Sequence, residues 1–166
     1  MGSGSDLEIV KPCLQVLEQL EIDFEVFISS AHRTPQRTDK LIASALQAGA
    51  QVFICAAGMA AHLAGTVAAR TCKPVIGLPI AGSTLNGLDA LFSTAQMPAG
   101  FPVATVALNG ARNAAWLAAQ ILALQESALE KRIQAARQEM AMSIENASQK
   151  LEAQFNLKCS PKTGQV

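Results

Sequence analysis

Short, wholly apolar segments alternate with helical segments along most of this chain, and this alternation constrains the fold more than any other feature. Three such segments are VFICAA at 52–57, PVIGLP at 74–79 and PVATVAL at 102–108. A strand that is apolar at every position needs cover on both faces, which is typical of parallel sheets flanked by helices. The pattern therefore predicts a doubly wound α/β domain.

The segments between the strands have helical periodicity and recognisable ends. In TPQRTDKLIASALQAG at 34–49, Thr34 is a candidate N-cap, Pro35 suits the first turn and Gly49 suits the end. Further helices are expected at 7–21, 59–72, 87–97 and 111–124. A fourth apolar segment, FEVFI at 24–28, predicts another strand.

The predicted organisation is an α/β domain over 1–125, a C-terminal amphipathic helix over 126–153 and a flexible tail over 154–166. Apolar residues recur along this helix at steps of three and four: Leu129, Ile133, Ala136, Met140, Ile144, Ala147 and Leu151. Such a stripe predicts packing against either its own domain or a neighbouring subunit. The chain opens at a junction between a loop and a helix, so we expect the sheet to lack its first strand.

Composition and charge argue against several function classes. The 166 residues carry 13 basic and 13 acidic side chains, which gives no overall attraction to nucleic acid or to an anionic membrane. No apolar run reaches the roughly 20 residues of a membrane helix, and the first residues do not resemble a secretory signal.

The four cysteines form no CxxC pair and no metal-binding pattern with the two histidines. We therefore expect no metal, and a protein of the reduced cytoplasm. Cys55 and Cys72 lie in or beside apolar segments, so both are expected to be small core residues.

Residues capable of chemistry gather in the loops after the predicted strands, where open α/β sheets bind ligands. His32 lies in SSAHRTP at 29–35 and His62 in AAGMAAHLAG at 56–65. Arg33 follows His32, so an acid/base imidazole and a phosphate-binding guanidinium would stand side by side. A helix-capping histidine beside a solvated arginine is an equally good interpretation, and for His62 a structural role is the better one.

The opening loop, MGSGSD at 1–6, has the composition of an anion-binding turn. Glycines allow close backbone approach, serine hydroxyls donate hydrogen bonds, and the first amides of a helix favour a phosphate. Glycine- and serine-rich stretches also form plain turns, and Asp6 is adequately explained as a helix cap. The loop by itself therefore indicates a phosphate site only weakly.

Taken together and in order, the loops and strands resemble one family. The blocks MGSGSD, SAHRTP, GMAAHLAG, PVIGLPI and GLDALFSTAQMPAGFPVATVALNGARNAAWLAAQIL are similar to the N5-carboxyaminoimidazole ribonucleotide mutases of purine biosynthesis, over residues 1 to about 125. The resemblance implies a flavodoxin-like three-layer fold, a homo-octamer, a small-molecule nucleotide substrate and no metal or organic cofactor. It implies an isomerase that moves a carboxylate from the exocyclic nitrogen to ring carbon C4 of aminoimidazole ribonucleotide.

The resemblance also implies roles for individual residues. His32 would be the general acid/base, and Arg33 would bind the substrate phosphate. A loop near 81–85 would close over the imidazole. The other substrate-binding residues implied are Ser3, Ser5, Asp6, Ser30, Gly58, Met59, Ala60, His62 and Leu63.

Two alternative functions stay open. A related branch carboxylates the same ribonucleotide directly with CO2, but it carries Lys where this chain has Arg33 and lacks the histidine found here at His62. A non-catalytic nucleotide-binding assembly module would keep the fold without a complete site. The absent first strand affects the expected geometry of the opening loop more than that of His32.

Overall fold

The structure, a computed structural model, describes residues 1–82 and 84–155. Its three strands are parallel and stand in the order β1-β2-β3. Their bounds are β1 (Phe53–Gly58), β2 (Val75–Ile80) and β3 (Ala104–Thr105). β1 and β2 pair along their whole length, whereas β3 pairs only with Ile76 and Gly77. The predicted α/β class with a parallel sheet is therefore confirmed.

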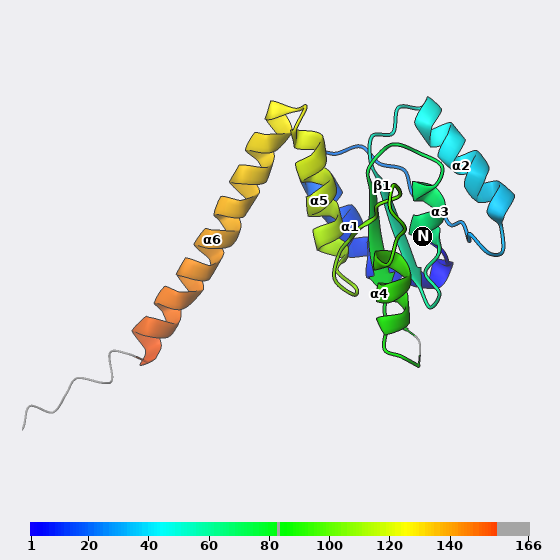
Figure 1. The fold of residues 1–166 in the computed structure, drawn as a ribbon. Helices are drawn as coiled ribbons and strands as arrows, with labels where there is room; N and C mark the ends of the chain where they lie inside the picture. The colour runs from blue at the N-terminus through cyan, green and yellow to red at the C-terminus, as the bar shows by residue number, and fades with distance from the viewer. Residues whose placement is uncertain (83, 156–166) are drawn as a thin grey trace, which may run out of the picture.

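Helices make up most of the rest of the described chain (Figure 1). A short 3-10 turn, η1 (Gly4–Asp6), precedes the first of them. The helices are α1 (Leu7–Gln19), α2 (Pro35–Gln47), α3 (Leu63–Ala68), α4 (Leu88–Ala95), α5 (Ala111–Ala123) and α6 (Ser127–Phe155). Each predicted helix is present. α3 begins later than expected because Met59 adopts a left-handed backbone, with φ of 55°, which no helix continues through.

The sheet is covered on both faces, as its apolar strands require (Figure 1). On one face, α1 and α5 pack with residues such as Ile76 and Leu78 into the larger core cluster. On the other face, Ile42 of α2 and Leu63 of α3 pack with Cys55 and Val75. Burial of this apolar surface from water is the main stabilising contribution to the domain.

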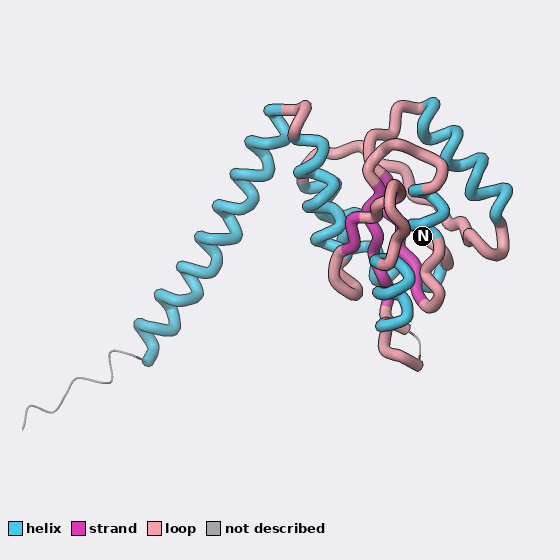
Figure 2. Tube along the Cα trace, in the orientation of Figure 1, coloured by secondary structure: helices cyan, strands magenta, loops and turns pink. Residues whose placement is uncertain are grey.

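Two predicted strands differ from the structure. The segment at 24–28 is drawn as loop in Figure 2, because no neighbouring strand pairs with it. The predicted strand at 102–108 shortens to β3, whose pairing with β2 covers two residues. An apolar sequence pattern can predict that a segment is extended. Whether the segment forms a β-strand also depends on a neighbouring strand that pairs with its backbone.

Cys72 was expected in the core and is exposed instead, in the turn between α3 and β2. Cys55 is buried in β1, as expected. Burial raises the pKa of the Cys55 thiol to about 12, so this side chain behaves as a small neutral group.

α6 projects away from the rest of the domain (Figure 1). Only the start of its apolar stripe is buried, at Leu129, Ile133 and Ala136. Arg132 anchors this part, because its Nε donates to the carbonyl of Leu20 at 2.8 Å. The rest of the stripe is exposed: Met140, Ile144, Ala147 and Leu151. Among the described helices, none is both long and apolar enough to cross a bilayer.

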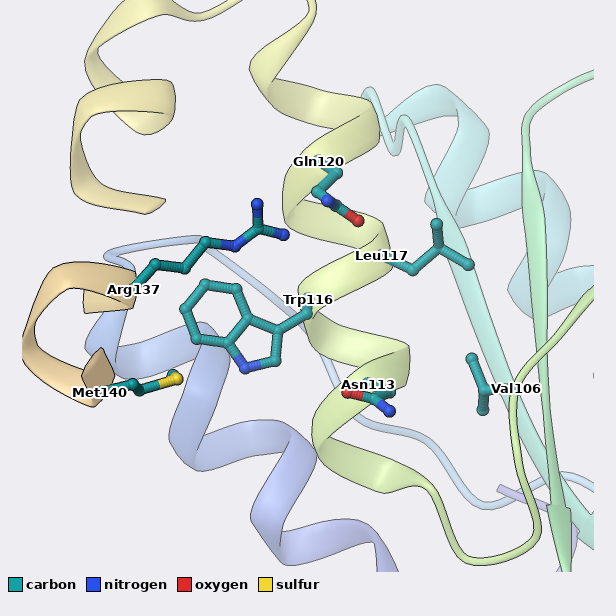
Figure 3. Close-up of a pocket in the computed structure, with 7 residues that line it drawn as sticks. All are labelled: Val106, Asn113, Trp116, Leu117, Gln120, Arg137 and Met140. Atoms are coloured by element: carbon teal, nitrogen blue, oxygen red, sulfur yellow. The ribbon is translucent and has the colours of Figure 1, made fainter. Parts of the chain in front are cut away.

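Figure 3 shows how α6 meets α5. Trp116 points from α5 toward α6, with Arg137 and Met140 of α6 around its ring. These side chains line a cavity of about 390 Å³ between the two helices. Residues 156–166, which hold most of the predicted flexible tail, lie outside the described part of the chain.

Gly77 tests the packing of α4 on β2. A Cβ at this position would collide with the side chain of Thr94 and lie 2.9 Å from Cγ1 of Val103. Thr94 is buried and its hydroxyl donates to Ala90, so it has little room to move. We expect Gly77→Val to lower the free energy of unfolding by about 3 kcal/mol, measured by urea denaturation.

Gly82 provides the matched control, because a Cβ there meets nothing within 4 Å. Gly82→Ala should change the free energy of unfolding by less than about 0.5 kcal/mol. Equal stability of the two variants would contradict the close approach of α4 to β2.

Candidate active site

The loops after β1 and β2 leave the sheet at one edge, because the two strands are parallel. β1 ends at Gly58 and β2 ends at Ile80, directly opposite it. Met1 and Gly2 reach the same edge from the other side of β1, where the Gly2 amide donates to the carbonyl of Ala56 at 2.9 Å. The opening loop and the loops after the strands therefore meet.

His32 and His62 lie next to one another although they come from different loops. Their ring centroids are 5.5 Å apart and the ring planes are inclined by 40°. His62 stands at the N-cap position of α3, but its side chain makes no capping bond. Both side chains are exposed, so a bound ligand could exchange a proton with either imidazole. The helix-cap interpretation of His32 has no support in this geometry, because Thr34 stands at the N-cap of α2.

Hydroxyl groups fix the loop that carries His32. The Thr34 hydroxyl accepts from the Ser30 amide and donates to the Ser30 carbonyl, both at 3.0 Å. Beneath them, the Ser29 and Thr38 hydroxyls bond at 2.8 Å in the protein interior. Thr34 was expected to cap α2, and it stands at the N-cap position. Its side chain makes no capping bond there and bonds to the Ser30 backbone instead. His32 therefore lies on a turn that side-chain hydrogen bonds stabilise.

Arg33 lies between the histidine loop and the opening loop. Its Nη2 donates to the Gly2 carbonyl at 3.4 Å, and its Nε lies 3.5 Å from the Ser30 hydroxyl. A guanidinium has five N–H donors, so these two contacts leave others to bind an anion. The side chain is exposed, which suits a group that meets a phosphate from solution.

The opening loop is a closed turn that directly precedes α1. Asp6 Oδ2 accepts from the Ser3 amide at 3.0 Å, and the Ser5 hydroxyl donates to the Ser3 hydroxyl at 2.8 Å. Asp6 stands at the N-cap of α1 but makes no side-chain capping bond there. The predicted N-cap position is therefore right, but the carboxylate closes the 3-10 turn and does not cap α1. Both serine hydroxyls lie at the start of a helix, where an anion is favoured.

The loop after β1 contributes mostly backbone. Gly58 packs closely on β2, since a Cβ there would lie 3.2 Å from the Ile80 carbonyl. Met59 and Ala60 are exposed beyond it. Among the predicted site residues, Leu63 alone is buried, and its side chain packs in the core beside Ile42. Leu63 therefore supports the loop from below.

Asn109 joins two further loops of this edge and was not predicted. Its side-chain oxygen accepts a hydrogen bond from the Ala81 backbone amide, and its backbone N–H donates to the Pro79 carbonyl, both at 2.9 Å. The left-handed backbone of Asn109, with φ of 54°, is typical of an Asn-Gly turn. That dipeptide after an apolar segment was the signal that could have identified it. The predicted lid near 81–85 starts at this junction, and its residue 83 lies outside the described part.

Within residues 1–82 and 84–155, no three His, Cys, Asp or Glu side chains gather in a cluster that could hold a metal ion. The groups at this edge are instead two imidazoles, a guanidinium, serine hydroxyls and one carboxylate. Such a set can bind an anionic ligand and transfer a proton.

Comparison with known proteins places this arrangement in context. Residues 1–143 match the profile of a family described as AIR carboxylase. The chain is 47% identical to the N5-carboxyaminoimidazole ribonucleotide mutase of Thermotoga maritima over 152 residues, which cover 92% of this chain and 89% of that protein. It is 53% identical to the phosphoribosylaminoimidazole carboxylase of Candida glabrata over 75% of this chain, but only 22% of that longer protein.

The fold has solved counterparts as well. The crystal structure of Treponema denticola PurE superposes with a TM-score of 0.82 at 26% identity. The alignment covers 92% of this chain and 95% of that chain. The similarity thus extends over the whole arrangement of sheet and helices.

Proposed function

Because this chain belongs to the AIR carboxylase family, we propose that it is an N5-carboxyaminoimidazole ribonucleotide mutase, an isomerase of purine biosynthesis. The observation that carries the proposal is the placement of His32 beside His62 and Arg33 at one edge of the sheet. Relatives named as this mutase are 43–48% identical to it, among them the proteins of Pyrococcus abyssi and Methanocaldococcus jannaschii.

The nucleotide's ends would be held by different loops. Arg33 and the hydroxyls of Ser3 and Ser5 take the phosphate, while Asp6 accepts hydrogen bonds from the ribose. Ser30 helps to orient Arg33, since its hydroxyl accepts from the Arg33 amide at 3.2 Å. The loop at 58–62, with Gly58, Met59, Ala60 and His62, lines the side where the imidazole ring lies.

The reaction then needs one proton carrier. Protonated His32 gives its proton to the exocyclic nitrogen as the N–C bond to the carboxylate breaks and CO2 leaves. The same CO2 forms a C–C bond at ring carbon C4, and neutral His32 removes the C4 proton to restore aromaticity. The proton count balances, because the imidazole ends as it began. Retaining CO2 beside C4 is a proximity effect, and one imidazole serves as acid in the first step and as base in the second.

The proposal extends to assembly. The last part of the α6 stripe, Ile144 to Leu151, is apolar surface exposed among the described residues of this chain. A homo-octamer of flavodoxin-like three-layer subunits, in which α6 covers a neighbour, would bury it. The division into a domain over 1–125, a helix over 126–153 and a tail over 154–166 fits this arrangement, and a cytoplasmic location stays a prediction.

Direct carboxylation with CO2 is the second candidate function, because yeast relatives of the same segment are named phosphoribosylaminoimidazole carboxylase. Arg33 and His62 favour the mutase, since the direct carboxylase branch has Lys at the first position and lacks the second histidine. A non-catalytic nucleotide-binding module is the third candidate.

Paired assays on the purified protein separate these functions. One supplies N5-carboxyaminoimidazole ribonucleotide, and the other supplies aminoimidazole ribonucleotide with bicarbonate. We expect saturable turnover only in the first. Comparable turnover in the second would establish the carboxylase, and nucleotide binding without turnover in either would establish the non-catalytic module.

His32→Asn tests the acid/base role. The amide keeps a similar polar volume but cannot carry the proton, so we expect the rate constant kcat to fall by about 1,000-fold or more. Nucleotide affinity, measured by calorimetry, should change little. His62→Asn should reduce kcat at least tenfold less, because His62 lines the site without transferring the proton. Equal losses in both variants would contradict a single acid/base.

Arg33→Ala tests the phosphate contact. Removing a charge-assisted hydrogen bond should weaken nucleotide binding by about 10- to 100-fold. Arg70→Ala is the control, because Arg70 follows α3 and pairs with Asp39 on the surface. If both variants bound the nucleotide as tightly as the parent, Arg33 would not hold the phosphate.

A further inference from the structure

The chain contains two Asn-Gly dipeptides, Asn86-Gly87 in the loop after β2 and Asn109-Gly110 in the loop after β3. Both asparagines adopt the left-handed backbone, with φ of 52° and 54°, which asparagine tolerates better than most residues. Both are exposed, and each is preceded by a leucine. The two sites therefore match in sequence, backbone conformation and exposure, and they differ in their hydrogen bonds.

An Asn-Gly dipeptide holds two groups that can react with each other. The backbone nitrogen of the glycine attacks Cγ of the asparagine side chain, and the glycine has no side chain that shields its nitrogen. The C–N bond of the side-chain amide breaks, and ammonia leaves with the proton that the backbone nitrogen gives up. Water then opens the resulting succinimide ring at either carbonyl, which yields aspartate or isoaspartate. One water enters and one ammonia leaves, so the reaction needs no oxidant or reductant.

Hydrogen bonds hold both reacting groups of Asn109-Gly110. The Asn109 Oδ1 accepts from the Ala81 backbone N–H at 2.9 Å. The Gly110 N–H, which would have to attack, donates to the Ala107 carbonyl at 2.9 Å. Ring closure at this site therefore requires that both bonds break first, and each broken bond adds to the barrier.

Asn86-Gly87 lacks these restraints within residues 1–82 and 84–155. Asn86 takes part in no hydrogen bond there, and the Gly87 N–H has no acceptor. One backbone bond closes the turn around them, from the Leu88 N–H to the Leu85 carbonyl at 3.1 Å. Exposed turns with few hydrogen bonds open at a low cost in free energy. The side-chain amide and the glycine nitrogen are therefore free to meet.

The packing of the turn requires this reactive dipeptide. A Cβ at Gly87 would lie 2.7 Å from Cδ2 of Leu108 and 2.9 Å from Cα of Ala81, and the φ of Gly87 is 87°. Positive φ at both central residues makes this a type I′ turn, for which Asn-Gly is a preferred sequence. Ala81 directly follows the end of β2, so the turn lies at the edge of the sheet that carries the candidate active site.

We propose that Asn86 is a site of spontaneous deamidation, at which the protein gains an aspartate or isoaspartate with time, while Asn109 stays intact. The reaction converts a neutral amide into a carboxylate at the carboxyl edge of the sheet. Formation of isoaspartate also routes the backbone through the side-chain Cβ, which lengthens the turn directly before α4.

A consequence for ligand binding rests on the proposed function. The nucleotide of that reaction carries a phosphate and a carboxylate, so a new negative charge at this edge repels it. Interactions between exposed charges are weak, so we expect deamidation to weaken nucleotide binding by about two- to fivefold.

Peptide mapping by mass spectrometry tests the modification. The full chain is incubated for several days at mildly alkaline pH and physiological temperature, and the peptides that contain Asn86 and Asn109 are then quantified in their intact, aspartate and isoaspartate forms. We expect modification at Asn86 to accumulate at least about tenfold faster, because the bonds of Asn109-Gly110 must break first. Equal rates, a faster reaction at Asn109 or no reaction at either site would overturn the proposal.

The same incubation in concentrated urea is the control for the role of the fold. Both sites have the sequence Leu-Asn-Gly, so the unfolded chain should modify them at similar rates. A difference as large in urea as in the folded protein would show that the hydrogen bonds at Asn109 do not protect it.

Asn86→Asp tests the effect on binding without the need for ageing. Its affinity for the nucleotide, measured by calorimetry, should fall by about two- to fivefold. Asn146→Asp is the matched control, because it adds the same charge at an exposed position on α6, and it should bind as the parent does. Unchanged affinity of Asn86→Asp would overturn the effect on binding. The mass measurement uses no substrate, so failure of the proposed mutase activity would leave the test of deamidation intact.

Discussion

The hydrogen bonds of Met1 and Gly2 are the contacts on which the candidate site depends. They connect the segment before the histidine loop to β1, through Phe27 and Ser29 on one side and Ala56 on the other. Together with the bond from Arg33 to the Gly2 carbonyl, they fix the position of the opening loop relative to His32. A few backbone hydrogen bonds therefore fix a large part of the site's geometry.

Burial explains which parts of the fold could be predicted from the sequence. β1 and β2 are apolar throughout because helices cover both faces, and the ends of α2 follow from Pro35 and Gly49. The segment at 24–28 was predicted from its apolar residues as well, yet it is exposed and is not a strand. Its pairing partner would have to come from elsewhere in the chain, and a local pattern carries no information about distant hydrogen bonds.

The candidate site shows the same division. The rule that ligands bind at the carboxyl ends of parallel strands places His62 after β1, and His32 lies beside it although the segment before His32 is not a strand. It could not supply the 5.5 Å between their rings, nor the turn that Asp6 closes. Leu63 shows the opposite limit, since it stands next to a site residue in sequence while its side chain points into the core. Distances and side-chain directions depend on packing, which a motif does not encode.

Arg33 has a second consequence for how the site works. Its guanidinium contacts both the Gly2 carbonyl and the Ser30 hydroxyl. Arg33 therefore joins the opening loop and the histidine loop, which under the proposed function both contact the phosphate. A lysine has a single flexible ammonium and could not span these acceptors with a planar fork. The difference between Arg and Lys at this position therefore changes the spacing of the loops as well as the charge contact. A phosphate held by more widely spaced loops would shift the substrate's imidazole ring relative to His32. Under the proposed reaction, that shift would change how close a released CO2 stays to ring carbon C4.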